Sequence, residues 1–154
     1  WEAMDEFERD FGLKWLGFFH RPVTPGKFMM RMRIPNGILT STQMRVLADI
    51  VQRYCQGAGF QDQGNADITT RQNLQLRGIR IEDVATIINL LAQAGLTCVQ
   101  SGMDNVRNIT GSPVAGIDAN ELIDTRGLCR ILQDAITNNG EGNLELSDLP
   151  RKFN

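Results

Sequence analysis

Metal ligands, disulfide partners and membrane-spanning stretches are scarce in this chain. It has three cysteines and one histidine among 154 residues, and no cysteine pair has CxxC spacing, so a zinc site built by this chain alone is not expected. The odd, scattered cysteine count indicates reduced thiols in a cytosol-like compartment, with at least two of them packed in the core. No apolar run approaches the roughly 20 residues needed to cross a bilayer. Walker, GxGxxG and nucleophile-elbow motifs are missing as well.

An excess of positive charge is a further absence. Sixteen basic and 18 acidic residues give a net charge of −2, whereas a general nucleic-acid-binding protein is more often basic. We therefore expect no nucleic-acid or membrane partner, and any anion site must arise from local clustering. Thirteen of the 16 basic residues are arginine, whose planar guanidinium favours bidentate recognition of carboxylates. The apolar share of 42% is that of an ordinary globular protein with one or two small domains.

Two stretches of the sequence predict strands that carry arginine on one face. In residues 69–78, period-2 alternation gives one face two guanidiniums and two amides, those of Arg71, Asn73, Gln75 and Arg77. Residues 27–34 repeat the pattern, with Arg31 and Arg33 opposite an apolar face of Phe28, Met30, Met32 and Ile34. Two strands with arginine-bearing faces predict a floor for a large, flat polyanion.

The remaining periodicities predict helices at residues 3–11, 82–94 and 125–137. Another helix is expected after a capping box at Thr40 to Gln43, and a further strand at residues 96–100. The order of strand, helix, strand, helix, strand predicts an α+β fold of ferredoxin-like type, with the helices on one face of a mixed or antiparallel sheet. From Gly102 the sequence changes to loop chemistry, so we place a domain boundary after residue 101.

Five segments resemble one family, the sirohaem-dependent nitrite and sulfite reductases, and most closely the ferredoxin-dependent nitrite reductases of cyanobacteria and plants. The segments are residues 14–17, 26–37, 67–78, 101–118 and 149–154, and they follow the family's order over nearly the whole chain. The resemblance implies sirohaem, a macrocycle with eight carboxylates, coupled to a 4Fe–4S cluster. It also implies ferredoxin as electron donor and six-electron reduction of nitrite to ammonia, in the cyanobacterial cytoplasm or the plastid stroma.

The resemblance also implies roles for individual residues. It places the family's sirohaem-binding strand at Thr69, Thr70, Arg71, Gln75 and Arg77, the face that the alternation indicates independently. It places three cations around the anion bound at the sirohaem iron, namely Arg31, Arg107 and Lys152, and it sets Arg151 against cofactor carboxylates. Guanidinium and ammonium groups suit both tasks, because they bind anions and supply positive charge as oxygens are protonated and leave as water.

The last residues of the chain favour nitrite over sulfite as the substrate. Sulfite reductases typically have Lys-x-Lys after Pro-Arg, whereas this chain has Lys152-Phe153-Asn154. A second cation would suit doubly charged sulfite, and a neutral asparagine suits singly charged nitrite. Sulfite reductase remains the alternative within the enzyme class.

The resemblance assigns residues 1–101 to the family's ferredoxin-like half domain and residues 102–154 to the beginning of its sirohaem domain. The family's four cluster cysteines lie in a C-terminal half that this chain does not contain. Cys55, Cys98 and Cys129 have neither the number nor the spacing to replace them. We therefore expect an N-terminal-half fragment that is inactive alone and has an exposed apolar seam where the other half packs.

Two other classes of protein remain open. One is a non-catalytic ferredoxin-like module that binds RNA or another polyanion, although neither arginine-bearing face has the aromatic residues that such surfaces use. The other is a scaffold that binds nothing. An arginine on a strand is usually solvated or ion-paired, and Arg33 fits pairing with a carboxylate at the edge of the core. Arg107, in a Gly/Asn loop, fits a turn residue.

Overall fold

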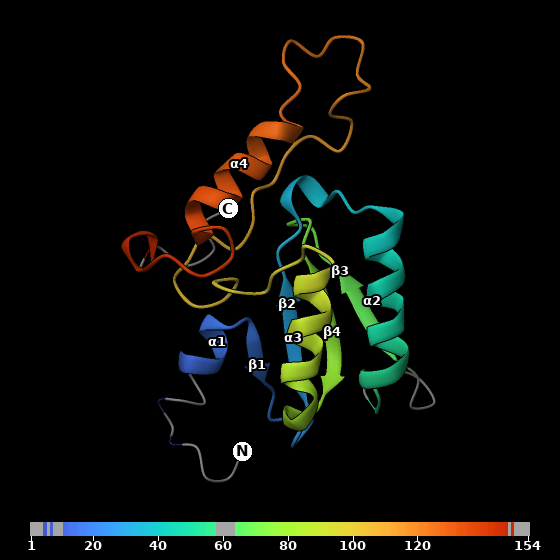
Figure 1. Cartoon of the computed structure of the whole chain (residues 1–154), viewed down its shortest axis with the longest axis vertical. Coiled ribbons are helices and arrows are strands. Elements are labelled where there is room, and N and C mark those ends of the chain that lie inside the picture. The colour runs from blue at the N-terminus through green and yellow to red at the C-terminus, as the bar shows by residue number, and fades with distance from the viewer. Residues whose placement is uncertain (1–4, 6, 8–10, 58–63, 148, 150–154) are drawn as a thin grey trace.

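A four-stranded antiparallel sheet, in the order β1-β2-β4-β3, organises the first two thirds of the chain (Figure 1). The computed structural model describes residues 5, 7, 11–57, 64–147 and 149. The strands are β1 (Phe18–His20), β2 (Phe28–Met32), β3 (Asn65–Ile68) and β4 (Leu74–Ile79). The α-helices are α1 (Leu13–Trp15), α2 (Ser41–Tyr54), α3 (Val84–Gln93) and α4 (Arg126–Thr137). Short 3-10 turns are η2 (Pro35–Gly37), η4 (Ile81–Asp83) and η5 (Leu144–Leu146).

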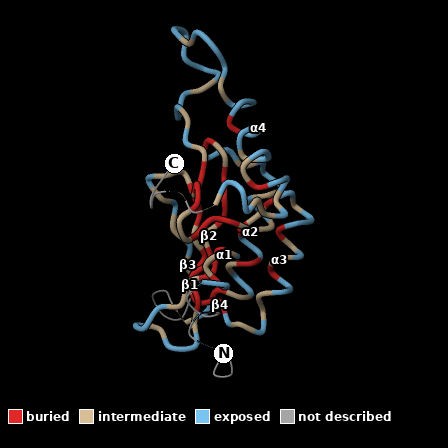
Figure 2. Tube along the Cα trace, turned by 90° about the vertical axis from the view of Figure 1, so that its left-hand side faces the viewer, coloured by how far each residue is buried: buried red, intermediate tan, exposed pale blue. Residues whose placement is uncertain are grey.

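The core lies between one face of this sheet and the helices α2 and α3. The apolar face predicted for residues 27–34 is buried as expected, and its members are Phe28, Met30, Met32 and Ile34. Buried residues of the facing helices complete the core, among them Leu47, Ile50, Ile87 and Leu91. Figure 2 shows the strands on one side and both helices on the other, so the opposite sheet face is left for polar groups. The predicted ferredoxin-like α+β fold is confirmed.

The predicted helix boundaries follow from local chemistry. Thr40 and Gln43 form a reciprocal capping box at the start of α2, as the sequence indicates. Helix α3 begins after η4 and stops at Gly95, whose φ of 67° is the left-handed conformation that a glycine adopts readily. The helix predicted for residues 3–11 lies mostly outside the described residues.

Two strand predictions need correction, and one strand was missed. Residues 69–73 form a turn between β3 and β4, and the strand resumes only at Leu74. Gln72 supplies the positive φ, 59°, that such a turn requires, and no glycine or proline marked it in the sequence. Residues 96–100 form a single bridge, between Arg33 and Thr97, rather than a strand. The edge strand β1, which is only three residues long, was not predicted.

Helix α4 packs against η2 and is followed by a polar turn. Its inward face carries Cys129 and Thr137, which are buried. Three of its apolar side chains are exposed, those of Leu128, Ile131 and Leu132. The preceding loop projects away from the sheet (Figure 1), and Figure 2 shows that it is exposed over most of its length. The described part of the chain therefore presents apolar surface on α4.

Candidate anion-binding site

The sheet face opposite the helices brings three predicted site residues together. Arg31 of β2 is paired in register with Gln75 of β4, which is paired in turn with Asp67 of β3. In the next row Arg77 of β4 lies between Met29 and Asn65. Directly opposed side chains in an antiparallel sheet have Cβ atoms roughly 4.5–5.5 Å apart. Arg31, Gln75 and Arg77 therefore share one polar face, as the alternation predicts.

Arg31 is held in place by contacts with β1 and with the chain after α3. Its guanidinium carbon lies over the ring of Phe19, 4.6 Å from the centroid, a cation–π arrangement. Its Nη1 donates to the carbonyl of Ser101 at 3.1 Å. The hydroxyl of Ser101 donates in return to the Arg31 carbonyl at 2.8 Å. The side chain is thus fixed by a backbone segment about 70 residues away in sequence.

Three guanidiniums gather at this point, those of Arg31, Arg71 and Arg107. Burial, then the charge of Arg107, then that of Arg71 lower the pKa of Arg31 to about 10. The group therefore stays charged at neutral pH while it experiences the repulsion of two like charges. The Nε atom of Arg71 is buried and has no hydrogen-bond partner among the described residues. A bound anion would relieve the repulsion and supply acceptors.

The turn at residues 69–73 positions Arg71 beside this cluster. Thr69 closes the turn, because its hydroxyl accepts from the Asn73 amide at 3.1 Å and its own amide donates to the Asn73 carbonyl at 2.9 Å. Thr70 is exposed at the tip. Asn108 donates to the carbonyls of Arg71 and Ile34, at 2.9 Å each. The turn is therefore fastened to the end of β2 by a buried side chain.

A second link fastens the same turn to the loop that follows. The side-chain amide of Gln72 donates to the Gly111 carbonyl at 2.9 Å, and its oxygen accepts from the Gly111 amide at 3.0 Å. Neither Asn108 nor Gln72 was singled out for this role from the sequence. The sequence gives no sign of these hydrogen bonds, because each amide is isolated among its neighbours. Asn108 and its partner Arg71 are 37 residues apart, and Gln72 and its partner Gly111 are 39 residues apart.

Arg77 has an ion-pair partner within the sheet. Its Nε donates to the carboxylate of Asp67 on the neighbouring strand, and both side chains are part exposed, so the pair adds about 0–1 kcal/mol to stability. Gln75 lies next to both, at a long 3.5 Å from Arg77 Nη2. Asp67 has the same strand parity as Arg77, but it was not predicted as a site residue. An incoming carboxylate would have to share Arg77 with Asp67.

Arg33 is placed differently from the expectation that it pairs with a carboxylate. It is fully buried, and its partners are the carbonyls of Gln100 and Val106 and the side-chain oxygen of Gln133. The two predicted residues Arg151 and Lys152 lie outside the described residues. The predicted set is therefore brought together at Arg31, Arg71, Arg107, Gln75 and Arg77, with Thr69 shaping the turn.

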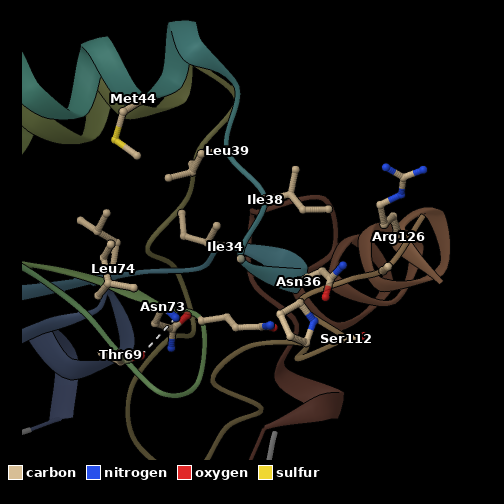
Figure 3. Close-up of a pocket in the computed structure, with 15 residues that line it drawn as sticks. Ile34, Asn36, Ile38, Leu39, Met44, Thr69, Asn73, Leu74, Ser112 and Arg126 are labelled. Carbon is tan, nitrogen blue, oxygen red and sulfur yellow. Dashed lines mark hydrogen bonds between the residues drawn. The ribbon is translucent and has the colours of Figure 1, made fainter. Parts of the chain in front are cut away.

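A separate cavity of about 520 Å³ adjoins the 69–73 turn and is lined in part by Thr69, Gln72 and Asn73. Figure 3 shows Thr69 and Asn73 beside an apolar wall of Ile34, Leu39 and Leu74, with Arg126 on the far side. None of the three clustered arginines is among the residues that line it. Its wall suits an apolar group, so it is distinct from the anion-binding face.

The described cysteines are poor candidates for metal ligands. All three are free and buried, and burial raises the pKa of Cys98 to about 12 and that of Cys55 to about 11, which disfavours the thiolate that metals bind. Cys55 and Cys98 belong to the apolar core, as predicted. Within residues 5, 7, 11–57, 64–147 and 149, no group of three or more His, Cys, Asp or Glu could hold a metal ion. No helix in this part of the chain is long and apolar enough to cross a membrane.

The fold and the arginine-bearing face define a class of protein. Residues 20–94 match the model of the nitrite/sulfite reductase ferredoxin-like half domain, and residues 102–154 match that of the nitrite and sulphite reductase 4Fe-4S domain. A solved structure of the NirA protein of Mycobacterium tuberculosis superposes with a TM-score of 0.73 at 25% identity, over 85% of this chain and 26% of that one. The chain belongs to the nitrite and sulfite reductase family.

Within this family, the chain is similar to curated ferredoxin–nitrite reductases. The chain is 70% identical to a ferredoxin–nitrite reductase of Leptolyngbya laminosa, over all of this chain and 29% of the relative. It is 51% identical to the chloroplastic ferredoxin–nitrite reductase of Arabidopsis thaliana, over 99% of this chain and 25% of the relative. The chain therefore spans between a quarter and a third of the length of these relatives.

Proposed function

We propose that this chain is part of a ferredoxin-dependent nitrite reductase, in which its arginine-bearing sheet face holds sirohaem and the anion reduced there. The observation that carries the proposal is a cluster of three like charges, those of Arg31, Arg71 and Arg107, in which the guanidinium of Arg31 lies over the ring of Phe19. Three adjacent guanidiniums suit a polycarboxylate better than a nucleic-acid base. Relatives named ferredoxin–nitrite reductase at 70% and 51% identity support the same reading.

The residues present fit sirohaem in their chemistry. Arg71 has a buried, unpartnered Nε in a fastened turn, so it would hold a cofactor carboxylate together with Arg77, Gln75 and the hydroxyls of Thr69 and Thr70. Arg151 is proposed for the same task by family resemblance. When bound, sirohaem supplies the iron at which nitrite is reduced. The full enzyme would also contain a 4Fe–4S cluster, for which ligands are proposed to come from beyond this chain.

The protein's own contribution to the reaction is proposed to be charge. Arg31 and Arg107, with Lys152, would bind the nitrite oxygens and orient the anion. A guanidinium with a pKa of about 10 still carries its proton at neutral pH, so Arg31 would stay positive throughout and stabilise negative charge that develops on oxygen. Asn154 in place of a second cation favours nitrite over sulfite. Ferredoxin is the proposed electron donor, and the compartment is the cyanobacterial cytoplasm or the plastid stroma.

The boundary proposed after residue 101 lies between the two matched ranges, which supports it. The exposed apolar stripe of Leu128, Ile131 and Leu132 on α4 is proposed to pack against the part of the enzyme that the relatives have in addition. A chain that spans about 29% of a relative is expected to be inactive alone. Methyl-viologen-driven nitrite reduction by the purified chain would contradict that expectation.

The test of the proposal is sirohaem uptake followed by visible absorption. The purified chain should gain sirohaem bands on titration, and Arg71→Ala should lower the affinity by roughly tenfold or more, since a charge-assisted pair contributes about 1.5–3 kcal/mol. Arg80→Ala is the matched control, because Arg80 follows β4 directly but is exposed and paired with Asp83. Uptake that is equal in the wild type, Arg71→Ala and Arg80→Ala would refute the assigned face.

A further inference from the structure

Arg33 is a buried cation whose hydrogen bonds go to backbone carbonyls and an amide. It is 0% exposed, and its Nη1 donates to the Val106 carbonyl at 2.6 Å and to the Gln100 carbonyl at 3.0 Å. Its Nε donates to Gln133 Oε1 of α4 at a longer 3.4 Å. Burial alone lowers its pKa to about 10, so the group remains charged at neutral pH. Burial of a charge in this way costs desolvation free energy, so we expect the residue to have a function.

The two carbonyls that Arg33 holds belong to residues that directly precede functional positions. Val106 precedes Arg107, and Gln100 precedes Ser101. Ser101 accepts from Arg31 Nη1 and donates to the Arg31 carbonyl. One guanidinium therefore restrains the backbone beside both arginines of the proposed anion site, and it extends from the chain just past β2, which carries Arg31.

We propose that Arg33 is a positioning residue that sets the separation and orientation of Arg31 and Arg107 for the anion. The inference rests on the proposed function only for the identity of that anion. Arg33 acts through the 100–107 segment and does not touch the anion itself. Its backbone amide also donates to the Thr97 carbonyl at 3.0 Å, so the residue is anchored at both its main chain and its side chain.

The geometry requires a guanidinium at this position. Two of its nitrogens reach three acceptors, since Nη1 donates to Gln100 and Val106 and Nε donates to Gln133. A lysine ammonium has one nitrogen on a flexible stem and cannot bind the carbonyls and Gln133 in that fixed planar spacing. Arg33→Lys keeps the charge and much of the volume, so it is expected to fold while it loosens the 100–107 segment. Arg33→Met removes every side-chain donor and leaves two buried carbonyls without this partner.

The test is arginine-selective NMR on the 154-residue chain with 15N-labelled arginine. The Nε–Hε signals of Arg31 and Arg107 report the surroundings of each side chain, and a nitrite titration reports the anion. In Arg33→Lys both signals should shift and broaden, and the nitrite midpoint should rise on the order of tenfold, as for other residues that orient a binding group. The control is Arg53→Lys, an exposed site on α2 paired with Asp49, which should change neither.

The outcomes separate this inference from the proposed function. Wild-type positions of the Arg31 and Arg107 signals in a folded Arg33→Lys variant would overturn the inference. The signals could shift in Arg33→Lys while the wild type does not respond to nitrite. That result would support positioning by Arg33 and count against anion binding by this chain. Should Arg33→Lys unfold, Gln133→Ala decides, since it removes the acceptor of Arg33 Nε and leaves the contacts of Arg31 in place. A shift of the Arg31 or the Arg107 signal supports the inference, and two unmoved signals overturn it.

Discussion

Asn108 is predicted to be a principal support of the anion-binding face. Its side chain is 0% exposed, and its Nδ2 donates at 2.9 Å to the carbonyls of Ile34 and Arg71. In Asn108→Ala both carbonyls lose a buried partner, which costs about 1–3 kcal/mol per unsatisfied group. Removal of Asn108 Oδ1, which is buried without a partner among the described residues, returns part of that cost. We expect a net loss of about 2–3 kcal/mol.

The assay is equilibrium urea unfolding of the purified chain, with Asn120→Ala as the control. Asn120 is exposed in the projecting loop, so its substitution should change the free energy of unfolding by less than about 0.5 kcal/mol. The midpoint should fall for Asn108→Ala with an unchanged m-value, since the same surface is exposed on unfolding. A loss of less than about 0.5 kcal/mol would refute the reasoning, because the turn that carries Arg71 would then be held by other contacts.

Three further predictions concern packing and protonation. Gly17→Ala should lower the free energy of unfolding by more than about 2 kcal/mol in thermal unfolding, because φ is 81° and a Cβ would lie 2.9 Å from the Arg31 carbonyl oxygen. The control Gly127→Ala, in open space on α4, should raise it by about 0.5–1 kcal/mol. Equal effects of the two substitutions would contradict this reasoning. Ile131→Glu, at a side chain 66% exposed, should leave Tm nearly unchanged in thermal unfolding, and a large fall in Tm would show that this face of α4 is packed. Burial raises the pKa of Cys98 from 9.0 to about 12 and that of Cys55 to about 11, so the folded state binds more protons than the unfolded state above pH 9 and stability should fall between pH 9 and 10. Cys98→Val should reduce that slope and leave the part due to Cys55, and an unchanged slope would argue against burial of Cys98 as a cause.

The elements that periodicity predicted well are those whose apolar stripe faces the core. The apolar face of residues 28–34 was predicted correctly because Phe28, Met30, Met32 and Ile34 pack into the core under α2 and α3. The capping box marks the start of α2 from four residues of sequence. Periodicity also predicted α4 as a helix, which the structure confirms. It could not predict which side chains of that helix are covered, because burial depends on the neighbouring surface and not on the spacing of apolar residues.

The errors share one physical cause, which is tertiary contact over long sequence separations. The turn at residues 69–73 depends on Gln72 in a left-handed conformation, fastened by Gly111 and Asn108 from the following domain segment. Arg33 is buried because three acceptors 67 to 100 residues away converge on it. Neither arrangement has a local signature, so the sequence could place Arg31 and Arg77 on one face but could not identify the residues that hold that face.

The most direct test of the central claim compares sirohaem with its octamethyl ester. Both have the same macrocycle, but only sirohaem would offer free carboxylates to Arg71 and Arg77. The account predicts that the purified chain binds sirohaem in a titration followed by visible absorption, that affinity falls as salt rises, and that the ester binds far more weakly. Equal binding of the two compounds would contradict it, because recognition would then depend on the apolar ring and not on the guanidiniums.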